Sequence, residues 1–174
     1  MTGVQTCALP ISVRVVIDPA GTTILSETLR ASVENALDAV HLIGEDIEVR
    51  APQYVPLIIT AAICVAGEYW IDDVAPVVES AFTNGYTPDG TQAFFNPDRW
   101  TFGQALHASQ IEGWLKKIEG VEHVIEVHMT RWWDQSVTSN EVITVAPEEI
   151  VLVTNDPSRL ELGRISFAYQ GGRG

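Results

Sequence analysis

The sequence is short of basic residues, of cysteine and of long apolar runs. Its 174 residues include 10 lysines and arginines against 23 aspartates and glutamates, which gives a formal charge of −13. Such an acidic surface repels phosphate groups, so we expect neither a nucleic-acid partner nor docking on an anionic membrane. Two cysteines are too few for a disulfide framework. No apolar run reaches the roughly 18 residues that a membrane-spanning helix needs.

Enough apolar residues are present for a packed core. Hydrophobic residues make up 46% of the chain and charged residues 19%, a balance typical of a globular rather than a disordered chain. The length suits one domain or two small ones. Because there is neither an internal repeat nor a Gly/Ser-rich linker, we expect a single compact domain over 12–174.

The first eleven residues, MTGVQTCALPI, carry no charge and show neither helical nor strand periodicity. They also lack the basic segment and the continuous apolar segment of a signal peptide. Residues 2–11 can be back-translated, codon by codon, into a string that resembles a widely used sequencing-library adapter. We therefore interpret 1–11 as a disordered sequencing or cloning scar, and we expect the natural protein to extend upstream of Ser12. A genuine disordered tail is the alternative.

Hydrophobic periodicity predicts three helices. Apolar residues recur every three or four positions at about 24–40, between Asp72-Asp73 and Asn84-Gly85, and at about 103–118. The two aspartates favour a helix start because carboxylates cap free N–H groups and interact well with the helix dipole there.

Alternating or β-branched segments predict strands at 13–18, 46–51, 57–66, 121–131, 150–154 and 165–169. The segment 57–66, LIITAAICVA, is apolar on both faces, as in a central strand covered on both sides. Cys64 within it is then a small buried hydrophobe. Without one loop and one helix, the order from 13 to 131 is βαββαβ. We therefore predict an α/β fold (α+β): a two-layer sandwich on a ferredoxin-like plan, with a long loop, an extra helix and two added C-terminal strands.

The four histidines do not predict a metal site. His123 and His128 are five residues apart on one expected strand, an odd spacing that places them on opposite faces unless a bulge intervenes. Glu126 and His128 share a face, but two ligands are too few for a structural site. His41 and His107 are explained by packing or by the dipole of a neighbouring helix. We expect no metal and no cofactor.

No catalytic constellation stands out either, and we do not expect an enzyme. The sequence contains neither a G-x-S-x-G motif nor a glycine-rich phosphate-binding motif. A thiolate at Cys64 is disfavoured by its apolar surroundings. Carboxylate pairs such as Asp89 and Asp98 arise by chance among 23 acids, and they are the basis of a third alternative, a carbohydrate-active enzyme.

Aromatic residues concentrate in the loop 86–102 and after the strand 121–131. A loop of this length either packs onto its own domain or contacts a partner. The adjacent residues Trp132 and Trp133 point to opposite faces, so one of them is expected to be exposed. Since exposed aromatics anchor protein–protein interfaces, we select as interface candidates Tyr86, Phe94, Phe95, Trp100, Phe102, Trp132 and Trp133.

An ordered series of segments resembles the phage baseplate J-like proteins of contractile tails and related injection particles. The series covers about 12–174 and consists of VRAPQYVPL (49–57), PDG (88–90), FFNPDRWTFGQAL (94–106), GVEHV (120–124), EIVLVTNDP (149–157), LGRI (162–165) and GGR (171–173).

The resemblance implies a structural role in the baseplate wedge, through contacts with other baseplate subunits and with copies of the same chain. It implies no cofactor, and it places the protein in a virion tail baseplate or tail-like particle, made in the bacterial cytoplasm. Family members are much longer, so we expect this chain to be a C-terminal fragment. The alternative is a small ligand-binding or regulatory βαββαβ module, which would need a pocket with convergent polar groups.

Overall fold

The computed structural model describes residues 11–40 and 45–173. The expectation for the N-terminal scar falls almost entirely on residues outside these ranges, as does that for His41. The chain divides into two compact units, one ending at Pro52 and the other spanning Gln53–Gly174, where we expected one over 12–174. The two units are therefore described separately.

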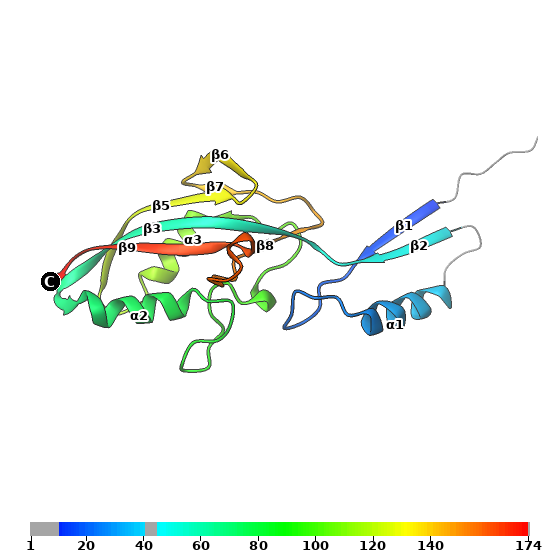
Figure 1. The fold of residues 1–174 in the computed structure, drawn as a ribbon, viewed down its shortest axis with the longest axis horizontal. Helices are drawn as coiled ribbons and strands as arrows, with labels where there is room; N and C mark the ends of the chain where they lie inside the picture. Colours follow the sequence, from blue (N-terminus) through cyan, green and yellow to red (C-terminus); the bar gives the residue numbers. More distant parts are fainter. Residues whose placement is uncertain (1–10, 41–44, 174) are drawn as a thin grey trace, which may run out of the picture. The chain divides into compact units, whose positions relative to one another are not determined.

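The first unit is a single βαβ element (Figure 1), made of β1 (Ile11–Val16), α1 (Glu27–Asp38) and β2 (Glu45–Arg50). The two strands pair in parallel, and the helix forms their crossover. The helix begins after Ser26, whose Oγ accepts a hydrogen bond from the Leu29 N–H at 3.2 Å. No residue of α1 is buried, so this unit has little core of its own.

The second unit is built around β3 (Gln53–Trp70), a strand of 18 residues (Figure 1). One edge of β3 pairs antiparallel with β5, and the other pairs in parallel with β8 and then with β9. β6 extends the sheet beyond β5, and a short β4–β7 pair lies apart from it. The remaining bounds are α2 (Ile71–Ala81), η1 (Pro97–Arg99), β4 (Leu106–His107), α3 (Ala108–Leu115), β5 (Val121–Arg131), β6 (Asp134–Ser139), β7 (Val142–Ile143), β8 (Glu149–Leu152), η2 (Leu160–Leu162) and β9 (Arg164–Arg173).

One face of this sheet carries the core. Every second residue of β3 is fully buried from Val55 to Val65. These side chains share one hydrophobic cluster with residues of α2 and α3, among them Val78 and Ile111. On the opposite face Thr60 is exposed and Cys64 is half-buried. The expectation of a strand covered on both faces is therefore wrong, because the face that carries Thr60 and Cys64 is only partly buried, although Ala62 between them is buried.

The second unit mixes helices and strands as predicted, but the strand pairing differs from the ferredoxin-like plan. That plan needs 13–18, 46–51, 57–66 and 121–131 in one sheet. Among the described strands, β1 and β2 pair with each other and with no other strand, whereas β3 pairs with β5, β8 and β9. Both edges of β3 are occupied by other strands, one by β5 and the other by the two C-terminal strands β8 and β9.

The predicted helices are present but shorter than expected. The third helix was expected over 103–118 and runs from Ala108 to Leu115, because Thr101–Ala105 form turns rather than a first helical turn. Within the described part of the chain, no helix combines the length and apolar character needed to cross a membrane.

Candidate functional site

Three of the predicted interface aromatics are core residues. Phe94, Phe95 and Trp100 are 4%, 3% and 6% exposed, so they cannot reach a partner in this conformation. Their rings contact one another, with Phe94 and Phe95 at a centroid distance of 4.8 Å. The indole Nε1–H of Trp100 donates a hydrogen bond to the Phe94 carbonyl at 2.9 Å. The interface prediction for these three residues is corrected accordingly: the loop folds back onto its own unit.

The loop is held in this position by a buried polar side chain. Asn96 is 4% exposed, and its Nδ2 donates to the Gly85 carbonyl at 2.9 Å. The backbone N–H of Phe94 donates to the Ala81 carbonyl at 2.9 Å, at the end of α2. These bonds anchor Phe94 and Asn96 to the end of α2 and to the turn that follows it, so burying the neighbouring rings leaves few backbone groups unpaired.

The other four candidates are at least partly accessible. Tyr86 is 62% exposed and Trp133 is 52% exposed, whereas Phe102 and Trp132 are half-buried. Trp133 stacks with the Arg131 guanidinium at 5.9 Å from the ring centroid. Among the described ring–ring contacts, none includes Tyr86, Trp132 or Trp133, so the structure does not join them into one aromatic patch.

An apolar groove of about 580 Å³ lies between α2, the turn at 87–91 and the end of α3. Val77, on its α2 side, is 52% exposed. Trp114, on its α3 side, lies between Arg99 and Lys117, whose cationic groups are 4.4 and 5.1 Å from the ring centroid. The groove is lined by Val77, Ser80, Ala81, Thr87, Pro88, Asp89, Thr91, Trp114, Lys117 and Ile118.

This groove was not predicted from the sequence. The apolar periodicity of the second and third helices contains no signal that a gap separates their apolar sides. The available indication was the adjacency of Val77 and Val78. Neighbouring helical residues are about 100° apart around the axis, so the apolar surface of this helix extends beyond the side on which Val78 is buried.

The rim of the groove is a turn organised by Asp89. The carboxylate of Asp89 accepts hydrogen bonds from the Thr87 and Thr91 hydroxyls, the latter at 2.9 Å. The hydroxyl of Thr87, followed by that of Thr91, lowers the pKa of Asp89 from its ordinary value of 3.8. The backbone closes through Thr87 N–H donating to the Thr91 carbonyl at 2.8 Å. The groove therefore has a preformed wall.

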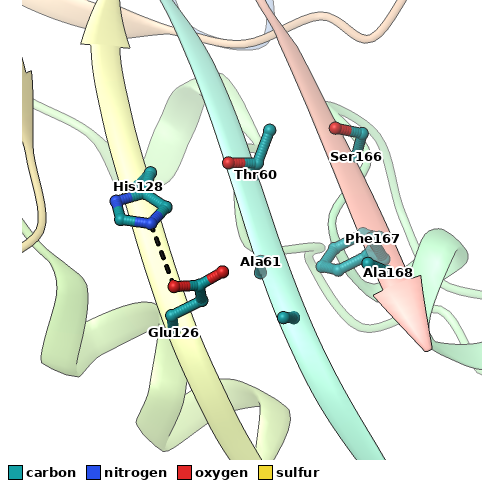
Figure 2. Close-up of a pocket in the computed structure, with 8 residues that line it drawn as sticks. Thr60, Ala61, Glu126, His128, Ser166, Phe167 and Ala168 are labelled. Carbon is teal, nitrogen blue, oxygen red and sulfur yellow. Dashed lines mark hydrogen bonds and ion pairs between the residues drawn. The ribbon is translucent and has the colours of Figure 1, made fainter. Parts of the chain in front are cut away.

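A second, smaller hollow of about 160 Å³ lies on the open face of the sheet (Figure 2). His128 and Glu126 of β5 are 3.2 Å apart, and Thr60 and Ser166 stand on β3 and β9 beside them. The shared face of Glu126 and His128 was predicted and is confirmed. Ser166 directs its Oγ–H to the Ile59 carbonyl at 3.4 Å rather than to His128, so these residues do not form a nucleophile–base pair.

The prediction that His123 and His128 lie on opposite faces is wrong. Along β3 the partners of Thr60, Ala62 and Cys64 are His128, Glu126 and His123. The register shifts between Ala62 and Ile63, where Ile125 is an extra residue on β5. This bulge returns His123 to the face of His128. Four residues of β3 still separate the two positions, about 13 Å at strand spacing, so they do not share an ion.

A scan against protein-family models found no match for this chain, and a search of curated proteins found none either.

Proposed function

We propose that this chain is a structural component of a contractile phage-tail or tail-like baseplate and acts through protein–protein contacts. Its partners would be other baseplate subunits and copies of itself, within the virion tail or tail-like particle. The resemblance of segments along 12–174 motivates the assignment. The observation that carries the contact role is the apolar groove, which the exposed side chain of Val77 lines.

The groove has the properties of a protein-docking surface. Interfaces place aromatic anchors in desolvated pockets and surround them with polar groups. Here the apolar floor includes Ala81 and Ile118, and the rim is polar at Thr87, Asp89 and Lys117. The rim turn is already hydrogen-bonded, which reduces the entropy lost on binding. A charge of −13 keeps free subunits apart and favours a basic partner.

The test is incorporation into particles. Tail-like particles would be purified from the bacterium that encodes the chain and examined by electron microscopy and mass spectrometry. The tagged chain should be present, and Val77→Lys should be depleted because it introduces a charge at the groove. Leu160→Lys is the matched control, because Leu160 is 42% exposed on η2 and does not line the groove. Absence of the unaltered chain from intact particles would refute the proposal.

A small ligand-binding module is the second candidate function, supported by the groove volume of about 580 Å³. Small-molecule pockets occupy roughly 300–1,000 Å³. A thermal-shift screen with metabolites should then find a compound that raises the melting temperature of the chain but not that of Val77→Lys. The baseplate proposal predicts no such compound.

A further inference from the structure

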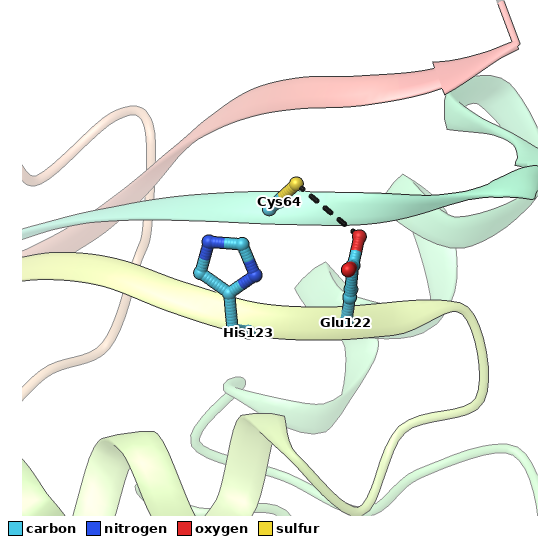
Figure 3. Close-up of side chains that lie close together, drawn as sticks. All are labelled: Cys64, Glu122 and His123. Carbon is cyan, nitrogen blue, oxygen red and sulfur yellow. Dashed lines mark hydrogen bonds between the residues drawn. The ribbon is translucent and has the colours of Figure 1, made fainter.

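We infer that Cys64, Glu122 and His123 form a binding site for a divalent metal ion of the zinc type, with one coordination position open. The Sγ of Cys64, a carboxylate oxygen of Glu122 and a ring nitrogen of His123 all lie within 4.8 Å of one another. Figure 3 shows Glu122 and His123 projecting from β5 toward Cys64 on β3. This inference is independent of the proposed baseplate role.

The separation of the three donors is close to that of a zinc site. Zinc binds sulfur at about 2.3 Å and nitrogen or oxygen at about 2.0–2.2 Å in a tetrahedral arrangement. Tetrahedral ligands are then roughly 3.3–3.8 Å apart. Small side-chain rotations of the two exposed residues, Glu122 and His123, cover the difference from 4.8 Å. No movement of the strands is needed.

A second bulge in β5 brings the two neighbouring ligands to one side. In a regular strand Glu122 and His123 would point to opposite faces. Cys64 pairs with His123, but Val65 pairs with Val121, so Glu122 is an extra residue in the ladder. Bulges redirect side chains in this way and are enriched beside functional sites. The shift thus creates a donor cluster that the sequence alone does not show.

The neighbouring strand leaves the sulfur uncovered. Gly171 of β9 has φ +72°, and a Cβ there would lie 3.1 Å from the Cys64 Sγ and 2.7 Å from the Val65 carbonyl oxygen. A side chain at this position would crowd the thiol. Because β9 has a glycine at this position, a metal ion can reach the sulfur from the open face of the sheet.

The three groups make few and weak interactions that a bound cation would have to replace. The thiol donates a weak hydrogen bond to Glu122 Oε2 at 3.7 Å, and no described residue forms a hydrogen bond or ion pair with the His123 ring. On binding, the ion takes the thiolate, the carboxylate and the neutral imidazole as ligands, and the thiol proton passes to solvent.

The donor types select the class of metal. A thiolate and an imidazole favour zinc or related borderline ions, whereas calcium and magnesium prefer oxygen ligands alone. Three protein ligands leave the fourth position to water or to a donor of another molecule.

Metal titration of the full chain tests the site. In a Cys7→Ser background, which leaves Cys64 as the only thiol, cobalt should produce a sulfur-to-metal charge-transfer band that zinc removes. Cys64→Ser should abolish the band, and His123→Gln or Glu122→Gln should weaken zinc binding by more than about 10-fold, the loss seen even for residues that only orient a ligand. His128→Gln is the matched control and should bind zinc normally.

A second measurement requires no ligand variant. In the same background, zinc should slow alkylation of Cys64 by iodoacetamide, whereas magnesium should not, as followed by mass spectrometry. Absence of a charge-transfer band with no protection by zinc would overturn the site. Equal losses of affinity in His123→Gln and His128→Gln would also overturn it.

Discussion

Trp100 is an aromatic residue that stabilises the core rather than one that contacts a partner. Its ring is 6% exposed, contacts Phe94 and Phe95, and donates its indole hydrogen to a backbone carbonyl. Trp100→Ala should therefore lower the free energy of unfolding by about 3–5 kcal/mol, as expected for deletion of a core aromatic. Urea denaturation followed by circular dichroism measures the change.

Tyr86 is the matched control in the same loop. Tyr86 is 62% exposed, so Tyr86→Ala should change the free energy of unfolding by no more than about 0.5 kcal/mol. If Trp100→Ala and Tyr86→Ala proved equally mild, Trp100 would not be part of the core.

Tyr169 makes stability depend on alkaline pH. Burial, followed by the Glu79 charge, raises the pKa of Tyr169 from 10.0 to about 12, and its hydroxyl donates to the Ala75 carbonyl at 3.4 Å. The raised pKa means that the folded state favours the protonated phenol. Its contribution to stability is complete below pH 10 and is lost as the pH rises through about 12.

The matched variant is Tyr169→Phe, which keeps the ring but cannot ionise. Between pH 10 and 12 its free energy of unfolding should fall less steeply than that of the unaltered chain. Chemical denaturation at several pH values gives both slopes, and identical slopes would count against a raised Tyr169 pKa.

At the scale of elements, Gly163 controls the exchange of partners along β3. The strand pairs with β8 at Gln53–Pro56 and with β9 from Ile58 onward, and Gly163 immediately precedes β9. Its φ is +87°, and a Cβ there would lie 2.5 Å from the Leu152 carbonyl oxygen and 3.0 Å from the Leu57 nitrogen. Only a residue without a side chain allows this approach.

Gly163→Ala should therefore destabilise the second unit by about 1–3 kcal/mol or more, the cost of a strained backbone position. Gly85→Ala is the control, since a Cβ there meets nothing within 4 Å. Thermal unfolding of both variants measures the difference, and a Gly163→Ala protein as stable as Gly85→Ala would show that the strand exchange tolerates a side chain.

Element by element, the sequence predicted what depends on local pattern. The helix after Trp70 and the alternating strand 121–131 were expected from periodicity and are present as α2 and β5. The pairing of β3 with β8 and β9 was not predicted, because parallel pairing over such separations leaves no local signature.

The candidate sites were predicted less completely for the same reason. Alternation predicted that one of Trp132 and Trp133 would be exposed, and the exposed residue is Trp133. The burial of Phe94 depends on how the loop 86–102 folds back, and the grouping of Cys64 with Glu122 and His123 depends on a one-residue register shift. Neither can be derived from spacing along the chain.

At the scale of the whole molecule, the two units differ in how much core they hold. The hydrophobic cluster that includes Leu57, Phe82 and Leu115 lies entirely in the second unit. In the first unit no residue of α1 is buried, and the buried residues among those described there are Pro19, Val49 and Pro52. Local stability follows buried apolar contacts, so the first unit should open more readily.

Hydrogen exchange measures this difference. Backbone amides of β3, β5 and β9 should exchange slowly, whereas those of α1 and β2 should exchange faster after correction for intrinsic rates. Equal protection of the two units would show that the first unit is stabilised by more than its own contacts.

The pairing of β3 with β9 cannot form until the C-terminal strand has been synthesised. Ser166 bonds to Ile59 across 107 residues of chain. At roughly 5–20 residues per second, a ribosome needs about 5–20 seconds to deliver the second strand after the first. Throughout that interval the edge of β3 that will pair with β9 is open. Chaperones bind such unpaired apolar strands, and aggregation begins at them. The yield of folded protein is therefore decided while translation is still under way.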